Sequence, residues 1–330
     1  MRDLIGLWLR YARSMTGSRL SPHIRQIESP VTRSLLRPLT TERVVQFRTP
    51  LTDREYGRVG RLLTGHSDVA LRAYGVHITD LEFLAHFPHV RRFQADYLSK
   101  LESLDGLRHL PEDLESLTLG EAKTARQFSL RILERFTELR ELYVERHTKD
   151  IEVIGALTRL EDLTLRSITL PDLAILLPLT RLRSLELKLG GTKNLSLLPE
   201  IGRLRYLELW QVRGLSDISP VADLPHLQYL FLQSLRQVTQ LPVMTGLPAL
   251  RRVVLDTMKG ITDLRPLAGA PALEQLLLLA MRQVTLEDLQ CLAGHLTLRE
   301  AVFGLGSMKR NAAAYELVGV SQLASDFEFT

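Results

Sequence analysis

The side chains that could do chemistry in this chain are few and scattered. His77, His86 and His89 are close in the sequence, and imidazole is the commonest protein ligand for transition metals. The segment His86-Phe87-Pro88-His89 contains a proline, however, and proline disfavours the helical turn that would aim two rings at one ion. No cysteine accompanies them. We therefore predict no metal site and no bound cofactor.

A second pair, Cys291 and His295, is spaced by four residues and could face each other on a helical turn. A thiolate nucleophile needs that pairing, a third group to orient the base, and donors for an oxyanion. The sequence offers no such third group or donors. It also lacks a glycine-rich phosphate loop, an H-E-x-x-H motif and a G-x-S-x-G motif. We therefore expect no enzymatic activity.

The elements that position all these residues come from one repeated pattern, Leu-x-x-Leu-x-Leu. Its copies follow one another at steps of 21 to 25 residues between positions 90 and 298. Leu-x-Leu alternates with period two, which predicts a short strand with one buried face. The clear copies begin at Leu114, Leu139, Leu160, Leu182, Leu204, Leu227, Leu250 and Leu273, with weaker copies at Val90 and Leu298.

The stretch after each strand is also patterned. Its apolar residues recur at every third position, which is typical of a 3₁₀ turn or a short helix. One repeat cannot bury its own apolar face, but stacked repeats share a continuous core. The two clearest such stretches contain Leu215, Ile218 and Val221, and Ile261, Leu264 and Leu267.

This pattern resembles the leucine-rich-repeat family over about residues 68–303. The segment Ile-Thr-Asp-Leu-Arg-Pro-Leu at 261–267 is similar to bacterial internalin-type repeats. The resemblance implies an α/β leucine-rich-repeat solenoid that is capped at both ends. Its curved parallel sheet would form the concave face, and 3₁₀ turns or short helices would form the convex face.

The chain departs from the family at one position. The ninth residue of a repeat is usually Asn or Cys, whose side chain bonds the backbone of the turn. Without that residue, the turn amides need other partners, because buried backbone groups are rarely left unpaired. Here the ninth residues include Ile168, Val212, Leu235, Met258 and Met281.

We predict three parts: an N-terminal basic segment (1–43), a solenoid (44–305) and a C-terminal cap (306–330). Apolar residues at helical spacing between Leu4 and Met15 predict a helix that covers the first repeat, because an open end exposes core. Residues 16–41 are expected to be loop or short helix, and Val44, Val45 and Phe47 a leading strand. Residues 311–318 predict a closing helix that starts at an Asn cap and ends before a glycine.

Charge and cysteine content narrow the function classes. The net charge is +4, but the first 61 residues carry twelve Arg against five acidic residues. Such a basic segment could meet a membrane surface or phosphates. The single cysteine, Cys291, favours a reducing cytoplasm, because secreted repeat proteins commonly staple their ends with disulfides. No apolar run is long enough to span a membrane, and we expect a monomer on its own.

The candidate binding face follows from strand geometry. Residues that alternate with the leucines point away from the core onto the predicted concave surface. Aromatic residues and arginine, which are enriched at interface hot spots, concentrate in one sector of it. The alternative is that these rings pack sideways and stabilise the sheet. The set comprises Tyr206, Trp210, Tyr229, Phe231 and Arg252, the apolar residues Val254, Leu277 and Leu279, and the acidic residues Glu186, Glu208 and Asp256.

These observations favour a non-enzymatic scaffold or inhibitor that binds a protein through its concave face. We do not expect nucleic acid there, because the columns mix acidic and basic residues and contain no Lys/Arg stripe. The alternative is a protein that docks on a membrane or a nucleic acid through residues 1–43. The two hypotheses differ in salt dependence, since phosphate-driven binding falls steeply with salt.

Overall fold

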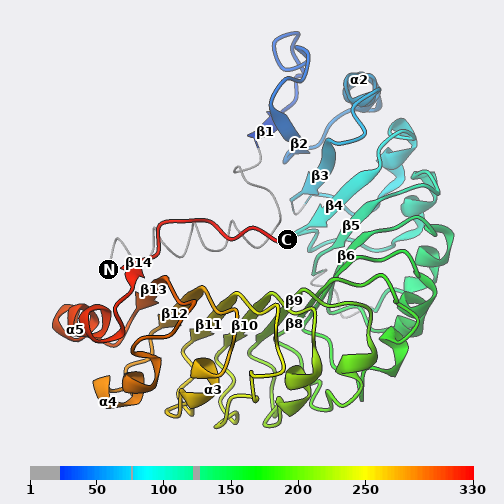
Figure 1. Cartoon of the computed structure of the whole chain (residues 1–330). Coiled ribbons are helices and arrows are strands. Elements are labelled where there is room, and N and C mark those ends of the chain that lie inside the picture. The colour runs from blue at the N-terminus through cyan, green and yellow to red at the C-terminus, as the bar shows by residue number, and fades with distance from the viewer. Residues whose placement is uncertain (1–22, 76, 122–126) are drawn as a thin grey trace. The chain divides into compact units, whose positions relative to one another are not determined.

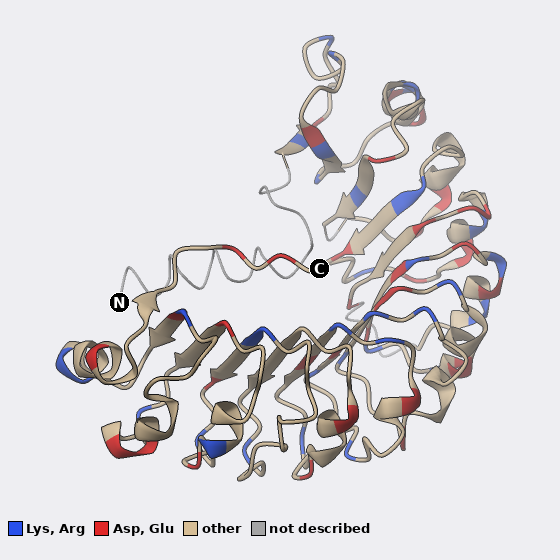
Figure 2. Cartoon of the chain, viewed as in Figure 1, with Lys and Arg blue, Asp and Glu red and all other residues tan. Residues whose placement is uncertain are grey.

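A computed structural model describes residues 23–75, 77–121 and 127–330 of the chain (Figure 1). The described residues form two compact units that divide between Val153 and Ile154: unit 1 lies before this point and unit 2 after it. In each unit, short parallel strands follow one another in chain order, with turns and short helices between them. Acidic and basic residues are interspersed over both units (Figure 2). No described helix has the length and apolar character that crossing a membrane requires.

Unit 1 begins with two strands and one regular helix, α2. Helix α2 starts at Thr52, whose hydroxyl accepts from the Glu55 amide while the Glu55 carboxylate accepts from the Thr52 amide. This reciprocal capping fixes the start of the helix. The elements are β1 (His23–Ile27), β2 (Glu42–Phe47), α2 (Asp53–Leu63), β3 (Ala70–Tyr74), η1 (Glu82–His86), β4 (Arg92–Asp96), η2 (Asp105–His109), β5 (Ser116–Leu119), η3 (Leu130–Arg135) and β6 (Glu141–Glu145). A further 3₁₀ turn, η4 (Ile151–Ala156), spans the boundary between the units.

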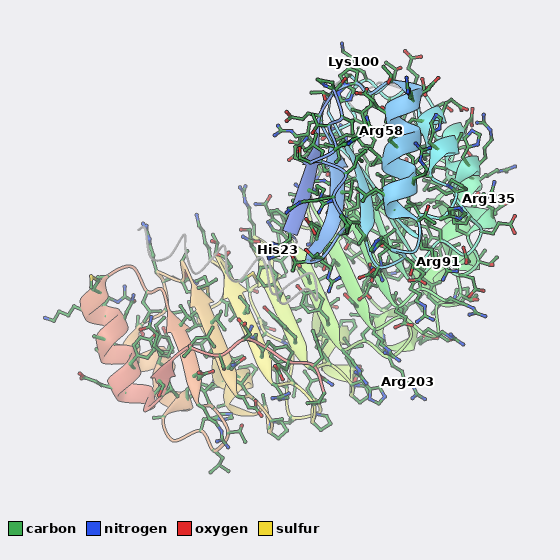
Figure 3. All side chains as sticks on the ribbon, turned by 90° about the horizontal axis from the view of Figure 1, so that it is seen from above. His23, Arg58, Arg91, Lys100, Arg135 and Arg203 are labelled. Carbon is green, nitrogen blue, oxygen red and sulfur yellow. The ribbon has the colours of Figure 1, made fainter. Side chains whose placement is uncertain are left out.

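Unit 2 contains the most regular repeats and the C-terminal helix. Exposed side chains such as Arg203 project away from its ribbon, as Lys100 does in unit 1 (Figure 3). Its elements are β7 (Asp162–Arg166), η5 (Ala174–Leu176), β8 (Ser184–Lys188), η6 (Leu198–Glu200), β9 (Tyr206–Trp210), η7 (Ser219–Asp223), β10 (Tyr229–Gln233), β11 (Arg252–Asp256), α3 (Arg265–Ala268), β12 (Gln275–Leu279), α4 (Leu286–Leu289), η8 (Gln290–Leu292), β13 (Glu300–Phe303), α5 (Met308–Val318) and β14 (Ser321–Gln322).

The predicted leucine ladder is confirmed. Each second leucine of the pattern lies in a strand and is at most 2% exposed. The third-position pattern forms the predicted turns, in which the Val221 amide donates to the Ile218 carbonyl and the Leu267 amide donates to the Leu264 carbonyl. The fold is therefore a leucine-rich-repeat solenoid. The buried ladder consists of Leu117, Leu142, Leu163, Leu185, Leu207, Leu230 and Leu276.

The turn amides find backbone partners. In unit 2 the residue after each of β7 to β12 adopts a left-handed conformation with φ between 48° and 57°. The amide of this residue, or of the residue after it, donates to a carbonyl at the end of the next strand. Ser167 donates to Lys188, Gln211 to Gln233, and Met281 to Gly304.

In two repeats, a polar side chain also forms hydrogen bonds with backbone carbonyls of the turns. His147 occupies the ninth position of its repeat in unit 1, and its Nε2 lies 3.2 Å from the Gly120 carbonyl. In unit 2, Nε2 of Gln283 donates to the carbonyls of Met258 and Ile261. The missing asparagines are thus replaced by the backbone and by individual polar side chains.

The two ends differ in part from the sequence predictions. The leading strand at Val44, Val45 and Phe47 is present as part of β2. Residues 23–27, expected as loop or short helix, form strand β1 and pair with β2 in parallel. Arg25 is buried in β1, and its Nε donates to Glu42 at 3.1 Å. Arg25 stands where other repeats have an apolar residue, and the repeat pattern therefore did not predict this strand.

The predicted N-terminal helix lies outside the described residues. At the other end, helix α5 begins four residues earlier than the asparagine cap predicts. Its N-cap is Ser307, whose hydroxyl accepts from the Arg310 amide. Asn311 instead accepts from the Leu305 amide. Gly319 ends the helix with φ of 76°, as predicted.

Candidate functional site

The strand register in unit 2 assembles the predicted residues into three rows. We call the surface they form the strand face, meaning the side of β7 to β12 that carries the residues between the inward leucines. The first row contains Tyr206, Tyr229, Arg252 and Gln275; the second contains Thr164, Glu186, Glu208, Phe231, Val254 and Leu277; the third contains Arg166, Lys188, Trp210, Gln233, Asp256 and Leu279.

The strand face is not an open surface at its centre. Tyr229 and Arg252 are each 2% exposed, although they point away from the leucine core. In the second row, Phe231, Val254 and Leu277 are also buried. Strands β9, β10 and β12 consequently have four successive buried residues, and β11 has five. Tyr206, Glu208 and Asp256 are buried too. Of the predicted set, Glu186, Trp210 and Leu279 are partly exposed.

A charged cluster lies at one side of the strand face. The Lys188 ammonium is 2.5 Å from Glu186 and 3.1 Å from Glu208. The Tyr206 hydroxyl donates to Glu208 at 2.8 Å, and the Thr164 hydroxyl donates to Glu186 at 3.0 Å. The Glu208 side chain is 2% exposed, so one lysine serves two carboxylates with little solvent.

Burial dominates the electrostatics of this cluster. It raises the pKa of Glu208 to about 7, and the nearby charge of Glu186 adds to the rise, while Lys188 opposes it. Burial alone would lower the pKa of Lys188, but the two carboxylates raise it above the ordinary value. The cluster thus keeps a permanent cation beside a carboxyl group that can gain a proton near neutral pH.

Trp210 adjoins this cluster in the third row. The Arg166 guanidinium carbon lies 5.2 Å from the indole centroid, and the Lys188 ammonium lies 6.0 Å from it. Both are within the range of cation–π attraction. The indole Nε1 is buried and has no hydrogen-bond acceptor among the described residues. A buried donor without an acceptor is uncommon in a native structure.

At the other end of the third row, Asp256 is hydrogen-bonded and Leu279 is apolar. Asp256 accepts from the Gln233 side-chain amide at 2.8 Å and from the Thr257 hydroxyl at 2.8 Å. Burial raises the pKa of Asp256. Leu279 follows in the next strand and is partly exposed. The acidic residue predicted as a border is therefore engaged within the sheet.

The first row is occupied by a part of the chain that the sequence did not assign to the site. Residues 323–330, which we call the tail, continue from β14 across this row (Figure 1). The rings of Tyr206 and Tyr229 meet edge to face at 5.0 Å. Phe327 packs edge to face on Tyr229 at the same centroid distance, 5.0 Å. The predicted alternative, that the aromatic residues pack on one another, is therefore also present.

Two signals in the sequence could have revealed these features. The strands β10 to β12 read Tyr-Leu-Phe-Leu, Val-Val-Leu and Leu-Leu-Leu-Leu, and such unbroken apolar runs are typical of strands buried on both faces. The alternation Phe327-Glu328-Phe329 after the closing helix is a second short period-two pattern.

Cys291 and His295 each make a hydrogen bond with a backbone group. The Cys291 thiol donates to the Asp288 carbonyl at 3.3 Å, and burial raises its pKa, which disfavours the reactive thiolate. His295 accepts through Nδ1 from the Leu298 amide. His86 lies 3.7 Å from Asp53. Within the described ranges, no group of three or more His, Cys, Asp or Glu side chains is placed to hold a metal ion.

Comparison with known proteins identifies fold neighbours only. No protein-family model matches the sequence, and no curated protein matches it. Among solved structures, the internalin InlF of Listeria monocytogenes is similar, with a TM-score of 0.56 and 19% identity over 85% of this chain and 78% of that one.

Two further structures are similar at lower scores. Internalin C2 of Listeria monocytogenes has a TM-score of 0.42 and 20% identity, over 68% of this chain and 82% of that one. A leucine-rich-repeat protein of Leptospira interrogans has a TM-score of 0.47 and 16% identity, over 92% of this chain and 93% of that one. The InlF match agrees with the resemblance of the sequence to internalin-type repeats.

Proposed function

We propose that this leucine-rich-repeat protein is a non-enzymatic scaffold or inhibitor that binds another protein through the strand face of unit 2. The observation that carries the proposal is the gathering of Tyr206, Trp210, Tyr229 and Arg252 on neighbouring strands. Tyr, Trp and Arg are the side chains that most often dominate interface energetics. No comparable aromatic gathering occurs on the described strands β4 to β6 of unit 1, where the corresponding side chains are mostly charged or polar.

Trp210 is the proposed anchor. Its ring is partly exposed beside Lys188 and Glu186, and its buried N–H lacks an acceptor among the described residues. The partly exposed part of the indole would supply apolar contact area to a partner. Leu279 and Glu186 are the other partly exposed residues of the predicted set. We propose that these three side chains form the first contact with the partner.

The location and state of the protein are part of the same proposal. Cys291 is a free thiol in the structure, which is compatible with a reducing compartment such as the cytoplasm. We propose that the protein acts there as a monomer that binds a protein rather than a nucleic acid. The division into 1–43, 44–305 and 306–330 also remains a proposal.

The test is a titration of purified partner against matched variants. The full-length chain captures its partner, which is then identified, purified and titrated against wild type, Trp210→Ala and Ser216→Ala. Ser216 is exposed in the turn after β9 and serves as the control. We expect Trp210→Ala to lose about thirtyfold in affinity, which corresponds to about 2 kcal/mol, and Ser216→Ala to bind as wild type does.

The alternative docking mode gives the opposite result. Residues Arg10, Arg13 and Arg19 lie outside the described residues, and they belong to the basic N-terminal segment. Equal affinity of Trp210→Ala and wild type, with binding that collapses between low and high salt and after substitution of these arginines, would contradict the strand-face proposal. It would move the function to the N-terminal segment.

A further inference from the structure

The tail of unit 2 makes specific contacts with the first row of the strand face. Phe327 packs on Tyr229, and the guanidinium groups of Arg252 and Arg251 lie 5.1 Å and 5.6 Å from the Phe327 ring. Phe329 lies 6.4 Å from the Tyr206 ring, 6.5 Å from the Tyr229 ring and 5.0 Å from Phe327. Two phenylalanines separated by one residue therefore meet two tyrosines and two arginines.

The backbone of the tail is also bound. Gln228 donates its side-chain Nε2 to the Thr330 carbonyl at 2.9 Å and accepts from the Thr330 amide through Oε1 at 3.0 Å. Arg251 donates to the Glu328 carbonyl at 3.1 Å, and Arg252 donates to the Ser325 carbonyl at 3.3 Å. A primary amide that pairs with both backbone groups of one residue recognises an extended peptide without regard to side chain.

The other end of the tail is held by polar side chains of the last strands. Gln275 donates through Nε2 to the Ser325 hydroxyl at 2.8 Å, and that hydroxyl donates to the Glu300 carboxylate. Glu300 also accepts from the Ala324 amide. These contacts continue the line of tail contacts from Gln228 across β10 and β11 to β13.

The spacing of these contacts fits an extended chain. Ser325 meets β12 and β13, Phe327 meets β10, and Phe329 meets β9 and β10. Four residues of extended chain span about 13–14 Å. Crossing three strand intervals of about 4.8 Å requires about 14 Å. An extended peptide therefore advances by about one and a half strand intervals for every two residues as it crosses the strand face.

The tail is held less completely than the repeat core. Phe329 is 47% exposed, and Phe327 is partly exposed, whereas Tyr229 below them is 2% exposed. Asp326 and Glu328 alternate with the phenylalanines and are exposed. The tail thus covers the buried side chains of the first row, while much of its own surface stays in solvent. A segment held in this way can dissociate without exposing the leucine core.

We propose that the first row is a docking track for an extended, acidic peptide with aromatic residues two positions apart. Residues 325–330 are its tethered occupant, which a partner segment of that kind displaces. This inference rests on the proposed function, because it places the partner's segment on the same strand face. The tyrosines and arginines recognise the aromatic side chains, and Gln228 recognises the backbone.

Because the tail is attached to the chain, it competes strongly with a free peptide for the first row. A segment attached by a short linker acts at an effective concentration of about 1 mM or more. A free peptide with the same contacts therefore competes poorly with the tail in the wild-type chain. Removing the two phenylalanine rings weakens the tail without shortening the chain, and it should open the track to a free peptide.

The experiment uses a fluorescent peptide with the sequence of residues 321–330 and reads its anisotropy. It is titrated into the full-length wild-type chain and into the full-length variant Phe327→Ala/Phe329→Ala. We expect at least tenfold tighter binding to the variant than to wild type. A control peptide with alanine in place of both phenylalanines should bind at least tenfold more weakly than the parent peptide. Adding Gln228→Ala to the variant should weaken peptide binding several-fold, and adding Ser216→Ala should not.

Two outcomes overturn the proposal. Peptide binding that is absent from a folded variant shows that the first row is not a docking track. Equal binding to wild type and variant shows that the tail does not occupy it. If the double variant fails to fold, as judged by its melting curve, Phe329→Ala alone replaces it, since that ring is half in solvent.

The two proposals fail separately. If the peptide does not bind, the Trp210→Ala titration with purified partner still tests the proposed function. Trp210 lies in the third row and makes none of the tail contacts described above. Conversely, peptide binding to the variant together with unchanged partner affinity for Trp210→Ala would keep the track and remove Trp210 as the anchor.

Discussion

Strands β4 to β8 and strands β9 to β12 are built on the same repeat but differ on the face that points away from the leucines. In β4 to β8, buried residues alternate with exposed or partly exposed ones along each strand. In β9 to β12, at least four consecutive residues are buried. The inward positions therefore define the fold, and the outward positions define which strands present a surface and which are covered.

The physical difference lies in what the outward residues can bind. Those of β4 and β6 include Arg92 and Glu141, which form an exposed ion pair at 3.1 Å. Those of β10 and β11 include Tyr229 and Arg252, which contact each other and the tail. A repeat can thus vary its outer face from solvated charge to packed aromatic residues without changing the strand register.

The largest expected effect comes from an inward position, where both regions should respond alike. Leu207→Asp in β9 and Leu163→Asp in β7 each place a charge where exposure is 1% or less. A buried, unpaired carboxylate costs several kcal/mol or stays protonated at a strongly raised pKa. We expect both variants to unfold or aggregate, as measured by circular dichroism and thermal melting. An unchanged melting curve for either variant would contradict the strand register.

A charge at an outward position should separate the two regions. Val254 in β11 is 0% exposed, whereas Thr118 in β5 is partly exposed. We expect Val254→Asp to lower the free energy of unfolding by about 3 kcal/mol or more, and Thr118→Asp to change it by about 0.5 kcal/mol or less. Urea unfolding of both variants measures the difference. Equal losses would mean that the outer faces of β5 and β11 are covered to the same degree.

The charged cluster, which joins β8 to β9 where the two regions meet, predicts a pH dependence of stability. The pKa of Glu208 is raised from 4.5 to about 7 by burial, so the folded state holds a proton there that the unfolded state has lost. The contribution of Glu208 to stability is therefore greatest below about pH 4.5, falls as the pH rises to about 7, and is constant above that. Lys188 from β8 and Tyr206 from β9 contact the Glu208 carboxyl group, and the nearby charge of Glu186 from β8 adds to the rise in its pKa.

Unfolding free energies of wild type and Glu208→Gln between pH 4 and pH 8 test this expectation. Stability of wild type relative to the variant should decrease between pH 4.5 and pH 7. Glu141→Gln, in the exposed pair of β6, controls for the general loss of a negative charge. A difference that is flat or rises over this interval would show that Lys188, rather than burial, determines the ionisation of Glu208.

Much of the fold was predictable because the repeat is a local pattern. The Leu-x-x-Leu-x-Leu spacing gave the strands, the turns and the rows of the strand face, since period-two alternation fixes which side chains share a face. Strand β1 was missed because Arg25, paired with Glu42, stands where a repeat has an apolar residue. The ion pair joins residues 17 positions apart, which no local pattern reports.

The rows of the strand face were predictable from the sequence, but the surroundings of their side chains were not. Tyr206, Tyr229 and Arg252 were correctly placed in one row by the register. Their burial depends partly on the tail, and the Gln228–Thr330 pairing joins residues 102 positions apart. Such contacts depend on how the whole chain folds, so the spacing of residues in the sequence does not predict them. Phe327 and Phe329 are plain in the sequence, but no local pattern linked them to β9 and β10.

The smallest expected effect concerns an ion pair between β3 and β4, at the start of the first region. Arg72 in β3 donates through Nε to Asp96 in β4 at 2.8 Å, and both side chains are 23% exposed. Lys188 and Glu208, in contrast, are 14% and 2% exposed. Partly exposed pairs typically contribute 0.2–1 kcal/mol, about the range we expect here, because solvent screens the charges and the side chains lose entropy.

A double-mutant cycle isolates the pairwise term. The variants Arg72→Ala, Asp96→Ala and the double variant are unfolded in urea at low and at high salt. We expect a coupling of about 0.5 kcal/mol that shrinks at high salt. Dissolved ions weaken the attraction between exposed charges, and the Debye length falls to about 3 Å at 1 M salt. The corresponding cycle with Lys188→Ala and Glu208→Ala should give a larger coupling that salt changes little. Couplings of the same size and the same salt dependence would show that burial on the outer face does not distinguish the two regions electrostatically.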